Sequence, residues 1–268
     1  MYDIERCVIL HHCTESGHVV IPDDVTEIGE KCFQHEVQPE LWNSGTMIPN
    51  STVESIVIPD SVVKVGSQAF AVCDHLTEVE LPAMRFTSGE EFAYCSALKT
   101  VSVRPRDGFD TIIEFSKEMF QKCSSLEEIV LPKHGGVLNE RCFMCTGIKE
   151  IVIPEDIKLE GYGHFVACQS LTKAVINCQQ VAMNMFSDCI NLKYVELNNT
   201  KTIGMSAFTR CSSLEEITLP PTVTDIRHGA FRWCNNLRRI NVYPELFEHM
   251  WMDTVKDRAP DGVEINIL

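Results

Sequence analysis

The sequence predicts one solenoid, an array of stacked turns that share a continuous core and a parallel β-sheet. Three regularities of the 268-residue chain carry this prediction. Phenylalanine recurs at gaps of 21 to 28 residues from its second copy on, cysteine follows most copies three residues later, and apolar residues come nine and eleven residues after most copies. The recurring phenylalanines are Phe33, Phe70, Phe92, Phe120, Phe143, Phe165, Phe186, Phe208 and Phe231. Such a period is typical of repeat proteins, whose units bury their apolar faces only by stacking on one another.

Each repeat is predicted to contain one short strand that leads away from a compact turn. In the unit of Phe70, Val79 and Leu81 lie two residues apart, so both side chains point to the same side of a strand. Pro82 then ends the strand, because proline cannot donate to a β-ladder. Glycine stands four residues before three of the phenylalanines, at Gly29, Gly66 and Gly204. We expect a tight turn there that requires a positive φ angle.

In chain order, the pattern predicts three parts. Residues 1–22 read as an N-terminal hairpin cap, residues 23–242 as a solenoid of about nine coils, and residues 243–268 as a C-terminal cap. The C-terminal cap starts with a short helix, whose apolar side holds Leu246, Phe247, Met250 and Trp251. A cap is expected because the last coil would otherwise expose its core. The alternative is a helix that docks on a partner through Trp251, since tryptophan often anchors interfaces.

Three irregularities interrupt the period. The strand after Phe33 arrives about 14 residues late, which predicts an insertion at about residues 34–52, and the 28-residue gap before Phe120 predicts a smaller insertion around residues 104–110. The unit of Phe143 is one residue short, and Cys145 follows this phenylalanine by only two residues. The larger insertion contains Leu41, Trp42 and Met47. These side chains are costly to leave in water unless they pack or bind, and long loops are often functional.

The repeated unit, roughly L-x-x-I-x-I-P-x-x-V-x-x-I-G-x-x-A-F-x-x-C, resembles the BspA-type leucine-rich repeats, also called the Treponema pallidum type. The resemblance covers about residues 1–243. The expected fold is therefore a right-handed leucine-rich-repeat solenoid, mainly β or α/β, with a hairpin cap and a helical cap. The resemblance implies a curved array with a binding role and brings no catalytic residues. It also implies an alternative function, that of a cell-surface adhesin for host matrix proteins or other cells.

The composition narrows the range of partners. The net charge of −15 and a pI of about 5.0 disfavour nucleic acids and anionic membrane surfaces, because phosphate binding needs clustered lysine and arginine. No apolar run approaches the roughly 18 residues that span a bilayer, so membrane insertion is not expected. We expect a monomer that binds a protein partner of unknown identity.

The thirteen cysteines bear on the cellular compartment. In a small secreted chain they would suggest a disulfide scaffold, but eight of them belong to the repeat ladder, where buried thiols pack like small apolar side chains. Reduced thiols favour a cytoplasmic location. The first residues show no basic segment followed by an apolar run, so no signal peptide is visible. A signal peptide that had been removed would instead place the protein at the cell surface or outside the cell.

Two groups of cysteine and histidine raise an alternative function, that of a metal- or thiol-dependent enzyme. Cys142 and Cys145 have C-x-x-C spacing, and residues 11–13 read His-His-Cys. Zinc or redox use of C-x-x-C would need a second ligand pair or a βαβ context, and the sequence offers neither. His11 and His12 would point to opposite faces of a strand, so they are poorly placed to share one ion. We therefore expect no metal, no cofactor and no catalytic residues.

The candidate site is the outward side of the predicted sheet. One outward residue lies between the two inward residues of each strand, and in three consecutive units it is Val130, Val152 or Val175. The neighbouring outward row supplies Glu128, Glu150 and Tyr194. An apolar centre with a polar rim is typical of binding patches, although valine also favours strands for its shape alone. We predict a non-enzymatic protein–protein interaction module that binds here, with the insertion at 34–52 as the alternative binding loop.

Overall fold

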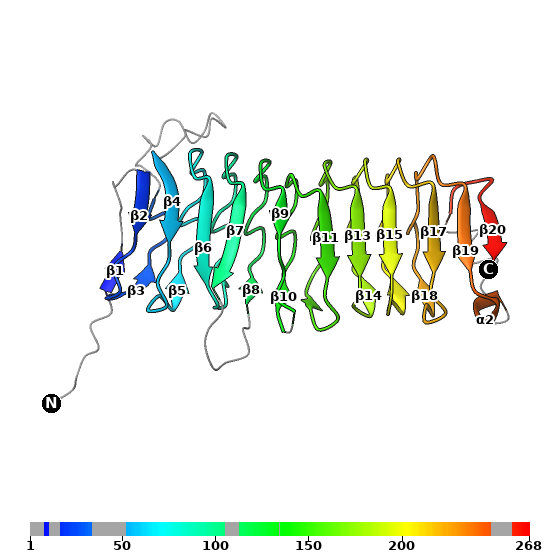
Figure 1. Cartoon of the computed structure of the whole chain (residues 1–268), viewed down its shortest axis with the longest axis horizontal. Coiled ribbons are helices and arrows are strands. Elements are labelled where there is room, and N and C mark those ends of the chain that lie inside the picture. The colour runs from blue at the N-terminus through cyan, green and yellow to red at the C-terminus, as the bar shows by residue number, and fades with distance from the viewer. Residues whose placement is uncertain (1–7, 11–16, 34–51, 105–112, 134, 248–258) are drawn as a thin grey trace.

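The structure is a computed structural model that describes residues 8–10, 17–33, 52–104, 113–133, 135–247 and 259–268. These residues form an elongated, mainly-β parallel solenoid of about eight turns (Figure 1). The leucine-rich-repeat array is thus confirmed, while the nine expected coils are about one too many. The chain completes eight turns between the first and the ninth stacked phenylalanine, because eight ring-to-ring steps connect nine rings.

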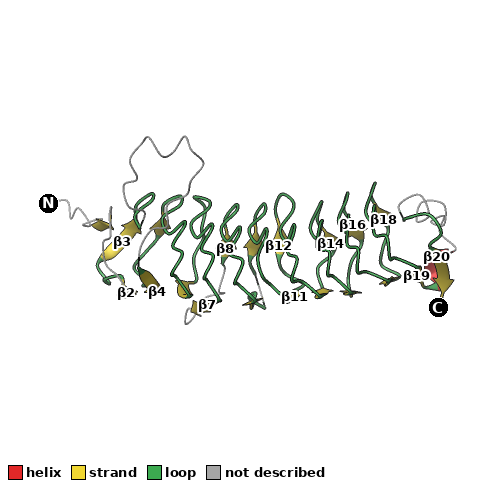
Figure 2. Ribbon diagram, turned by 90° about the horizontal axis from the view of Figure 1, so that it is seen from above, coloured by secondary structure: helices red, strands yellow, loops and turns green. Residues whose placement is uncertain are grey.

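Two rows of parallel strands run along opposite sides of the solenoid (Figure 2). The long row consists of β2 (Gly17–Val20), β4 (Val53–Val57), β6 (Glu78–Pro82), β7 (Thr100–Arg104), β9 (Glu128–Ile129), β11 (Glu150–Ile153), β13 (Lys173–Ile176), β15 (Tyr194–Leu197), β17 (Glu216–Leu219), β19 (Arg239–Val242) and β20 (Glu264–Ile267). The short row consists of β1 (Val8–Leu10), β3 (Val25–Ile28), β5 (Lys64–Val65), β8 (Glu114–Phe115), β10 (Val137–Leu138), β12 (Lys158–Leu159), β14 (Gln180–Val181), β16 (Thr202–Ile203) and β18 (Asp225–Ile226). The sequence pattern predicted the long row. The short row comes from a second pair of apolar residues in the repeat, such as Val62 and Val65 before Phe70.

The predicted phenylalanine ladder forms the centre of the core. All nine rings are buried, and consecutive ring centroids lie 4.7 to 5.6 Å apart. Most pairs are nearly parallel, with interplanar angles down to 2° between Phe208 and Phe231, and the pair of Phe33 and Phe70 is tilted by 32°. Each ladder ring stacks on the ladder rings before and after it, so the core grows by one layer with each repeat. The buried Phe115, which is not part of the ladder, also contacts Phe120 and Phe143.

The cysteine ladder runs beside the rings and bonds one turn to the next. Six thiols donate to the carbonyl oxygen of the phenylalanine in the preceding turn, at sulfur–oxygen distances of 2.9 to 3.2 Å. The pairs are Cys95 with Phe70, Cys123 with Phe92, Cys168 with Phe143, Cys189 with Phe165, Cys211 with Phe186, and Cys234 with Phe208. Each thiol therefore fills a small apolar space and also satisfies a buried carbonyl, which an alanine could not do.

The shortened unit breaks the cysteine ladder. Thr146, not Cys145, occupies the position three residues after Phe143, and its hydroxyl donates to the Phe143 carbonyl oxygen at 3.0 Å. The same hydroxyl lies 3.2 Å from the sulfur of Cys168 in the next turn. Cys145 is only partly buried, so the expectation that it belongs to the ladder is wrong. The hydroxyl thus occupies the position of a ladder thiol but, unlike the thiols, donates to the phenylalanine of its own turn.

The turns around the phenylalanines contain residues in the left-handed backbone region. Within the described part of the chain, all fifteen non-glycine residues with positive φ stand two residues before or two residues after a ladder phenylalanine. In the turn of Phe70, the amides of Gln68, Phe70 and Val72 donate to carbonyl oxygens of the next turn at 2.8 to 3.2 Å. The left-handed residues orient these alternate amides toward that turn, and the bonds offset a conformation that is unfavourable for most side chains.

The glycines four residues before phenylalanine have a different purpose from the one expected. Gly66 and Gly204 are not among the residues with positive φ. A Cβ atom at Gly66 would lie 2.4 Å from the backbone nitrogen of Glu30, and one at Gly204 would lie 2.7 Å from that of Met183. The prediction of a positive φ was therefore wrong at these two positions, where glycine lets the backbones of consecutive turns approach closely.

Both ends of the solenoid differ from expectation. In the N-terminal segment, β1 pairs with β3 and β2 pairs with β4, both in parallel, so these strands start the two rows and do not form a hairpin. At the other end, β20 adds to β19 in parallel, and the described residues contain only the four-residue helix α2 (Pro244–Phe247). A helical cap is not supported, because the strand β20 extends the sheet at this end of the solenoid.

Some sequence predictions lie outside the described residues. They concern Met250 and Trp251 of the expected helix, most of the insertion at 34–52 with Leu41, Trp42 and Met47, and most of the insertion around 104–110. The division of the chain at residues 22 and 242 stays a prediction. Among the described residues, no helix is long and apolar enough to cross a membrane.

Candidate interaction surface

The outward residues of the long row form a continuous surface, which we call the sheet face. In β11, Ile151 and Ile153 are buried while Glu150 and Val152 are exposed, as strand alternation requires. Parallel pairing aligns Val152 with Val175 of β13, and β9, which precedes Val130, lies next to β11. The structure thus brings the three predicted valines onto adjacent turns. Val130 is 74% exposed and Val152 is 54% exposed, whereas Val175 is half-buried.

The second predicted row lies beside the valines. Glu150 pairs with Lys173, and Lys173 pairs with Tyr194, so these three side chains stand side by side on β11, β13 and β15. The Lys173 ammonium lies 4.0 Å from a Glu150 carboxylate oxygen and 5.7 Å from the centroid of the Tyr194 ring. Glu128 occupies the same row on β9, where it pairs with Thr100. This row is a charged and aromatic rim along one side of the valines.

A hydrogen-bonded group fixes the far end of this rim. The Tyr194 hydroxyl donates to a Glu196 carboxylate oxygen at 3.1 Å, and the Asn198 side chain donates to the other oxygen at 2.9 Å. The hydrogen bonds from Asn198 and Tyr194 lower the pKa of Glu196 below its ordinary value, and the bond to Glu196 raises the pKa of Tyr194. Glu196 therefore stays ionised and orients the exposed Tyr194 ring next to the valines.

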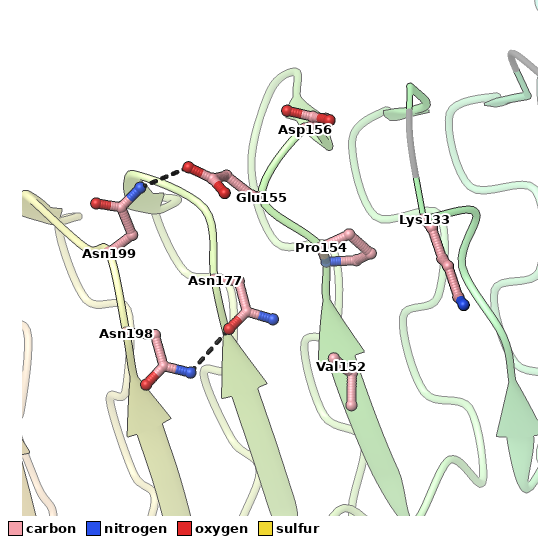
Figure 3. Close-up of a pocket in the computed structure, with 8 residues that line it drawn as sticks. All are labelled: Lys133, Val152, Pro154, Glu155, Asp156, Asn177, Asn198 and Asn199. Carbon is pink, nitrogen blue, oxygen red and sulfur yellow. Dashed lines mark hydrogen bonds between the residues drawn. The ribbon is translucent and has the colours of Figure 1, made fainter. Parts of the chain in front are cut away.

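On the other side of the valines, the structure shows a shallow groove of about 590 Å³ (Figure 3). It is lined by Lys133, Val152, Pro154, Glu155, Asp156, Asn177, Asn198 and Asn199. The amide of Asn198 donates to the side-chain oxygen of Asn177 at 2.8 Å, and the amide of Asn199 donates to Glu155 at 3.0 Å. Val152 thus belongs both to the valine row and to this polar groove.

Sequence reasoning missed the groove, although one signal pointed to it. Asn177 and Asn198 stand directly after β13 and β15, where other repeats end their strands with proline. Asparagine at two consecutive strand ends places two carboxamides on adjacent turns, and each can both donate and accept. Asn198 donates its side-chain amide to the side-chain oxygen of Asn177, so this bond does not use the Asn177 amide group or the Asn198 side-chain oxygen.

A second hollow, of about 390 Å³, lies at the N-terminal end of the sheet face, where Val20, Val57 and Pro59 line it together with Arg104. Arg104 donates to Glu80 at 2.6 Å and to Asp60 at 3.0 Å. A third bond, at 3.3 Å, reaches the carbonyl oxygen of Ile58. Because Arg104 uses its donors to connect its neighbours, we assign this hollow a structural role.

A family comparison decides the classification of the repeat. The model of the BspA type leucine rich repeat region matches six copies, over residues 47–172 and 161–250. The chain belongs to this family. A search of the curated proteins finds no match.

Several solved structures resemble this BspA-type chain. A leucine-rich repeat protein from Bacteroides ovatus is 21% identical with a TM-score of 0.37, and the match covers 96% of this chain and 85% of that protein. The Treponema pallidum leucine rich repeat protein is 20% identical with a TM-score of 0.46, covering 94% and 86%. A leucine rich cell surface protein from Faecalibacterium prausnitzii is 18% identical with a TM-score of 0.44, covering 100% and 92%.

The C-x-x-C pair of this BspA-type chain has the environment of structural thiols. Burial raises the pKa of Cys142 well above its ordinary value, and burial also raises the pKa of the partly buried Cys145. A nucleophilic or metal-binding thiol needs a lowered pKa, so both shifts have the wrong direction for that chemistry. Within the part of the chain that the structure describes, no three His, Cys, Asp or Glu side chains are grouped to hold a metal ion. His11, His12 and Cys13 lie outside it.

The exposure of Cys145 leads to a labelling prediction. After Cys7 and Cys13, which the structure does not describe, are replaced by serine, Cys145 should be the one thiol that a disulfide reagent modifies rapidly. The other ten described cysteines are buried, and their modification should require opening of the array. The further change Cys145→Ala, the residue that Ala167 supplies at the equivalent position, should abolish the rapid phase. Rapid modification of several thiols in the native protein would contradict the buried ladder.

His164 is a buried polar residue in the position directly before Phe165. Its Nε2 lies 3.1 Å from the carbonyl oxygens of both Leu138 and Glu160, so Nε2 carries the proton and donates to them. Its Nδ1 is buried without a hydrogen-bond partner. Burial accordingly lowers the pKa of His164 from its ordinary value of 6.5, because a second proton would place an unpaired charge in the core.

This histidine predicts an acid-sensitive stability. The unfolded chain binds a proton at His164 near pH 6.5 and the folded chain binds it only at lower pH, so the free energy of unfolding falls as the pH drops below 6.5. The slope from this one group is at most about 1.4 kcal/mol per pH unit. The variant His164→Met, which introduces the residue that Met185 supplies in the same position of the next turn, should remove this contribution in urea unfolding between pH 5 and 7. An identical pH profile in both proteins would show that His164 is not responsible.

Proposed function

We propose that this BspA-type repeat protein is a non-enzymatic interaction module that binds a protein partner on the sheet face. The observation that carries the proposal is the alignment of Val130, Val152 and Val175 on three adjacent turns, with two of them more than half exposed. Single exposed valines are common, whereas three on adjacent turns remove a larger apolar area from water when a partner covers them.

The surroundings of the valines support a recognition site. Half-buried Pro132 and Pro154 follow two of the three strands and extend the apolar area toward the groove. Glu128 and Glu150 border one side, and Asn177 and Asn198 border the other. An apolar centre gives affinity, while a rim of carboxylates and carboxamides selects partners with complementary donors. A partner with apolar residues at its centre and basic residues at its edge would fit this arrangement best.

The proposal predicts the effect of removing the valines. The triple variant Val130→Ser, Val152→Ser, Val175→Ser should weaken binding of any isolated protein partner at least about tenfold, or about 1.4 kcal/mol, while its unfolding midpoint stays close to that of the parent protein. Outward side chains contribute little to the core, so the two effects should separate. Titration calorimetry with the purified partner measures the affinity.

Two further variants make this test specific. Val63→Ser removes an equally exposed valine, 70% accessible, that lies outside the sheet face, and it should bind normally. Deletion of residues 38–49 removes Leu41, Trp42 and Met47. If the triple variant binds normally and the deletion abolishes binding, the partner binds the insertion and not the sheet face.

A further inference from the structure

A second exposed cluster lies in the segments that link the short row to the long row in the last two turns. It consists of Arg210, between β16 and β17, and of Arg232 and Trp233, between β18 and β19. We call it the Trp233 cluster. The Trp233 side chain is 45% exposed. The guanidinium carbon of Arg232 lies 4.0 Å from the centroid of its ring, and that of Arg210 lies 4.8 Å away.

The repeat backbone holds this cluster in place. Arg210 and Trp233 both occupy the left-handed position two residues after a ladder phenylalanine, with φ angles of 60°. The amide of Arg210 donates to the carbonyl oxygen of Arg232 at 2.9 Å, so the two arginines are tied together through the main chain. The three side chains therefore project from a rigid ladder of turns, and ordering them on binding costs little conformational entropy.

The charge of the cluster is only partly balanced. Asp188 pairs with Arg210 at 3.2 Å, whereas no carboxylate of the described residues lies within ion-pair distance of Arg232. A guanidinium that stacks on an indole keeps the donors at its edge free for a carboxylate. Arg232, together with Arg210 and its partner Asp188, places charged groups beside an exposed tryptophan, and tryptophan and arginine are the residues that most often dominate binding interfaces.

We propose that the Trp233 cluster is a second docking surface, which binds an acidic polypeptide segment carrying an apolar side chain next to its carboxylates. The arginines would bind the carboxylates and the indole would contact the apolar side chain. A nucleic acid fits less well, because the whole chain has 38 acidic and 23 basic residues, and this net negative charge disfavours the approach of a long polyanion. A short acidic segment, by contrast, can be short enough to contact only the two guanidinium groups and the indole.

Fluorescence anisotropy with synthetic peptides tests this proposal directly. The probe is a short labelled peptide rich in glutamate with one phenylalanine, and the comparison peptide has glutamine in place of each glutamate. The glutamate peptide should bind saturably and more weakly at higher salt, and the glutamine peptide should not bind. The double variant Arg210→Gln, Arg232→Gln should weaken binding of the glutamate peptide at least about tenfold.

Matched variants separate this surface from the sheet face. Arg239→Gln removes an exposed arginine that already pairs with Glu216 and Glu264, and it should bind the glutamate peptide normally. The triple valine variant should also bind it normally. Equal affinity of the double arginine variant and the parent protein, or no saturable binding of the glutamate peptide, would overturn the proposal. Tighter binding of a single-stranded RNA that depends on the same arginines would overturn it too, and would assign the cluster to nucleic acid.

Discussion

Replacing Phe208 by alanine should lower the free energy of unfolding by about 3–5 kcal/mol, as expected for a fully buried aromatic residue. Phe208 stacks between Phe186 and Phe231, at 5.6 Å from each ring centroid, and its side chain has no exposed area. The variant leaves a cavity inside the stack and removes the contacts of two successive turns at once. Urea unfolding followed by circular dichroism measures the loss.

The matched control is Tyr194→Ala, which removes an aromatic side chain from the surface. Tyr194 contacts Lys173 and Glu196 in solvent, where such contacts contribute little to stability. If both variants lower the free energy of unfolding by a similar amount, then aromatic surface in general, and not the buried stack in particular, stabilises the array. If Phe208→Ala lowers the free energy of unfolding by less than Tyr194→Ala does, the stack is dispensable for stability.

Gly66→Ala should destabilise the protein by about 3 kcal/mol, the upper end of the range for overpacked cores. The new Cβ atom would lie 2.4 Å from the backbone nitrogen of Glu30 and 2.6 Å from the carbonyl carbon of Gly29. These are main-chain atoms of the preceding turn, so no side-chain rotation relieves the overlap. The turns would have to separate, which would also weaken the 2.8 Å hydrogen bond from the Gly66 amide to Ile28.

Gly262→Ala provides the comparison, because it tests backbone conformation without overlap. Gly262 has a φ of +82°, and a Cβ atom added there would have no other atom within 4 Å, so only the left-handed strain of about 1–2 kcal/mol applies. Ser88 and Ser116 occupy the position of Gly66 in the next two turns and carry a Cβ there. If Gly66→Ala unfolds at the same urea concentration as the parent, the first turns can adopt the spacing that accommodates serine, and close approach is not the reason for glycine.

Much of the fold could be predicted because one spacing repeats. Phe70, Val79 and Leu81 are buried as the strand and ladder pattern required, and the same holds in the later units except at Val103, which is only partly buried. The ends could not be predicted in this way. A strand of three or four residues such as β1 or β20 has the same pattern whether it closes a hairpin or joins a parallel row, and only the position of its neighbour in space decides.

The left-handed turn positions also escaped prediction, for a physical reason. They are occupied by residues as different as Lys122, Val72 and Trp233, so no residue type marks them. Their conformation results from hydrogen bonds to the next turn, which a single repeat cannot show. The valine row was predictable from strand alternation, whereas the groove was missed, since Asn177 and Asn198 lie beyond the ends of β13 and β15, where alternation no longer predicts the direction of a side chain.

The cross-turn hydrogen bonds and the stacked rings connect the turns in series along one axis. A pulling force applied to the two ends would therefore load every interface equally, and the array would yield first at its weakest junction. Each turn of 21 to 23 residues that detached would lengthen the chain by about 70 Å. The solenoid would thus lengthen in discrete steps under tension while its remaining turns stay folded.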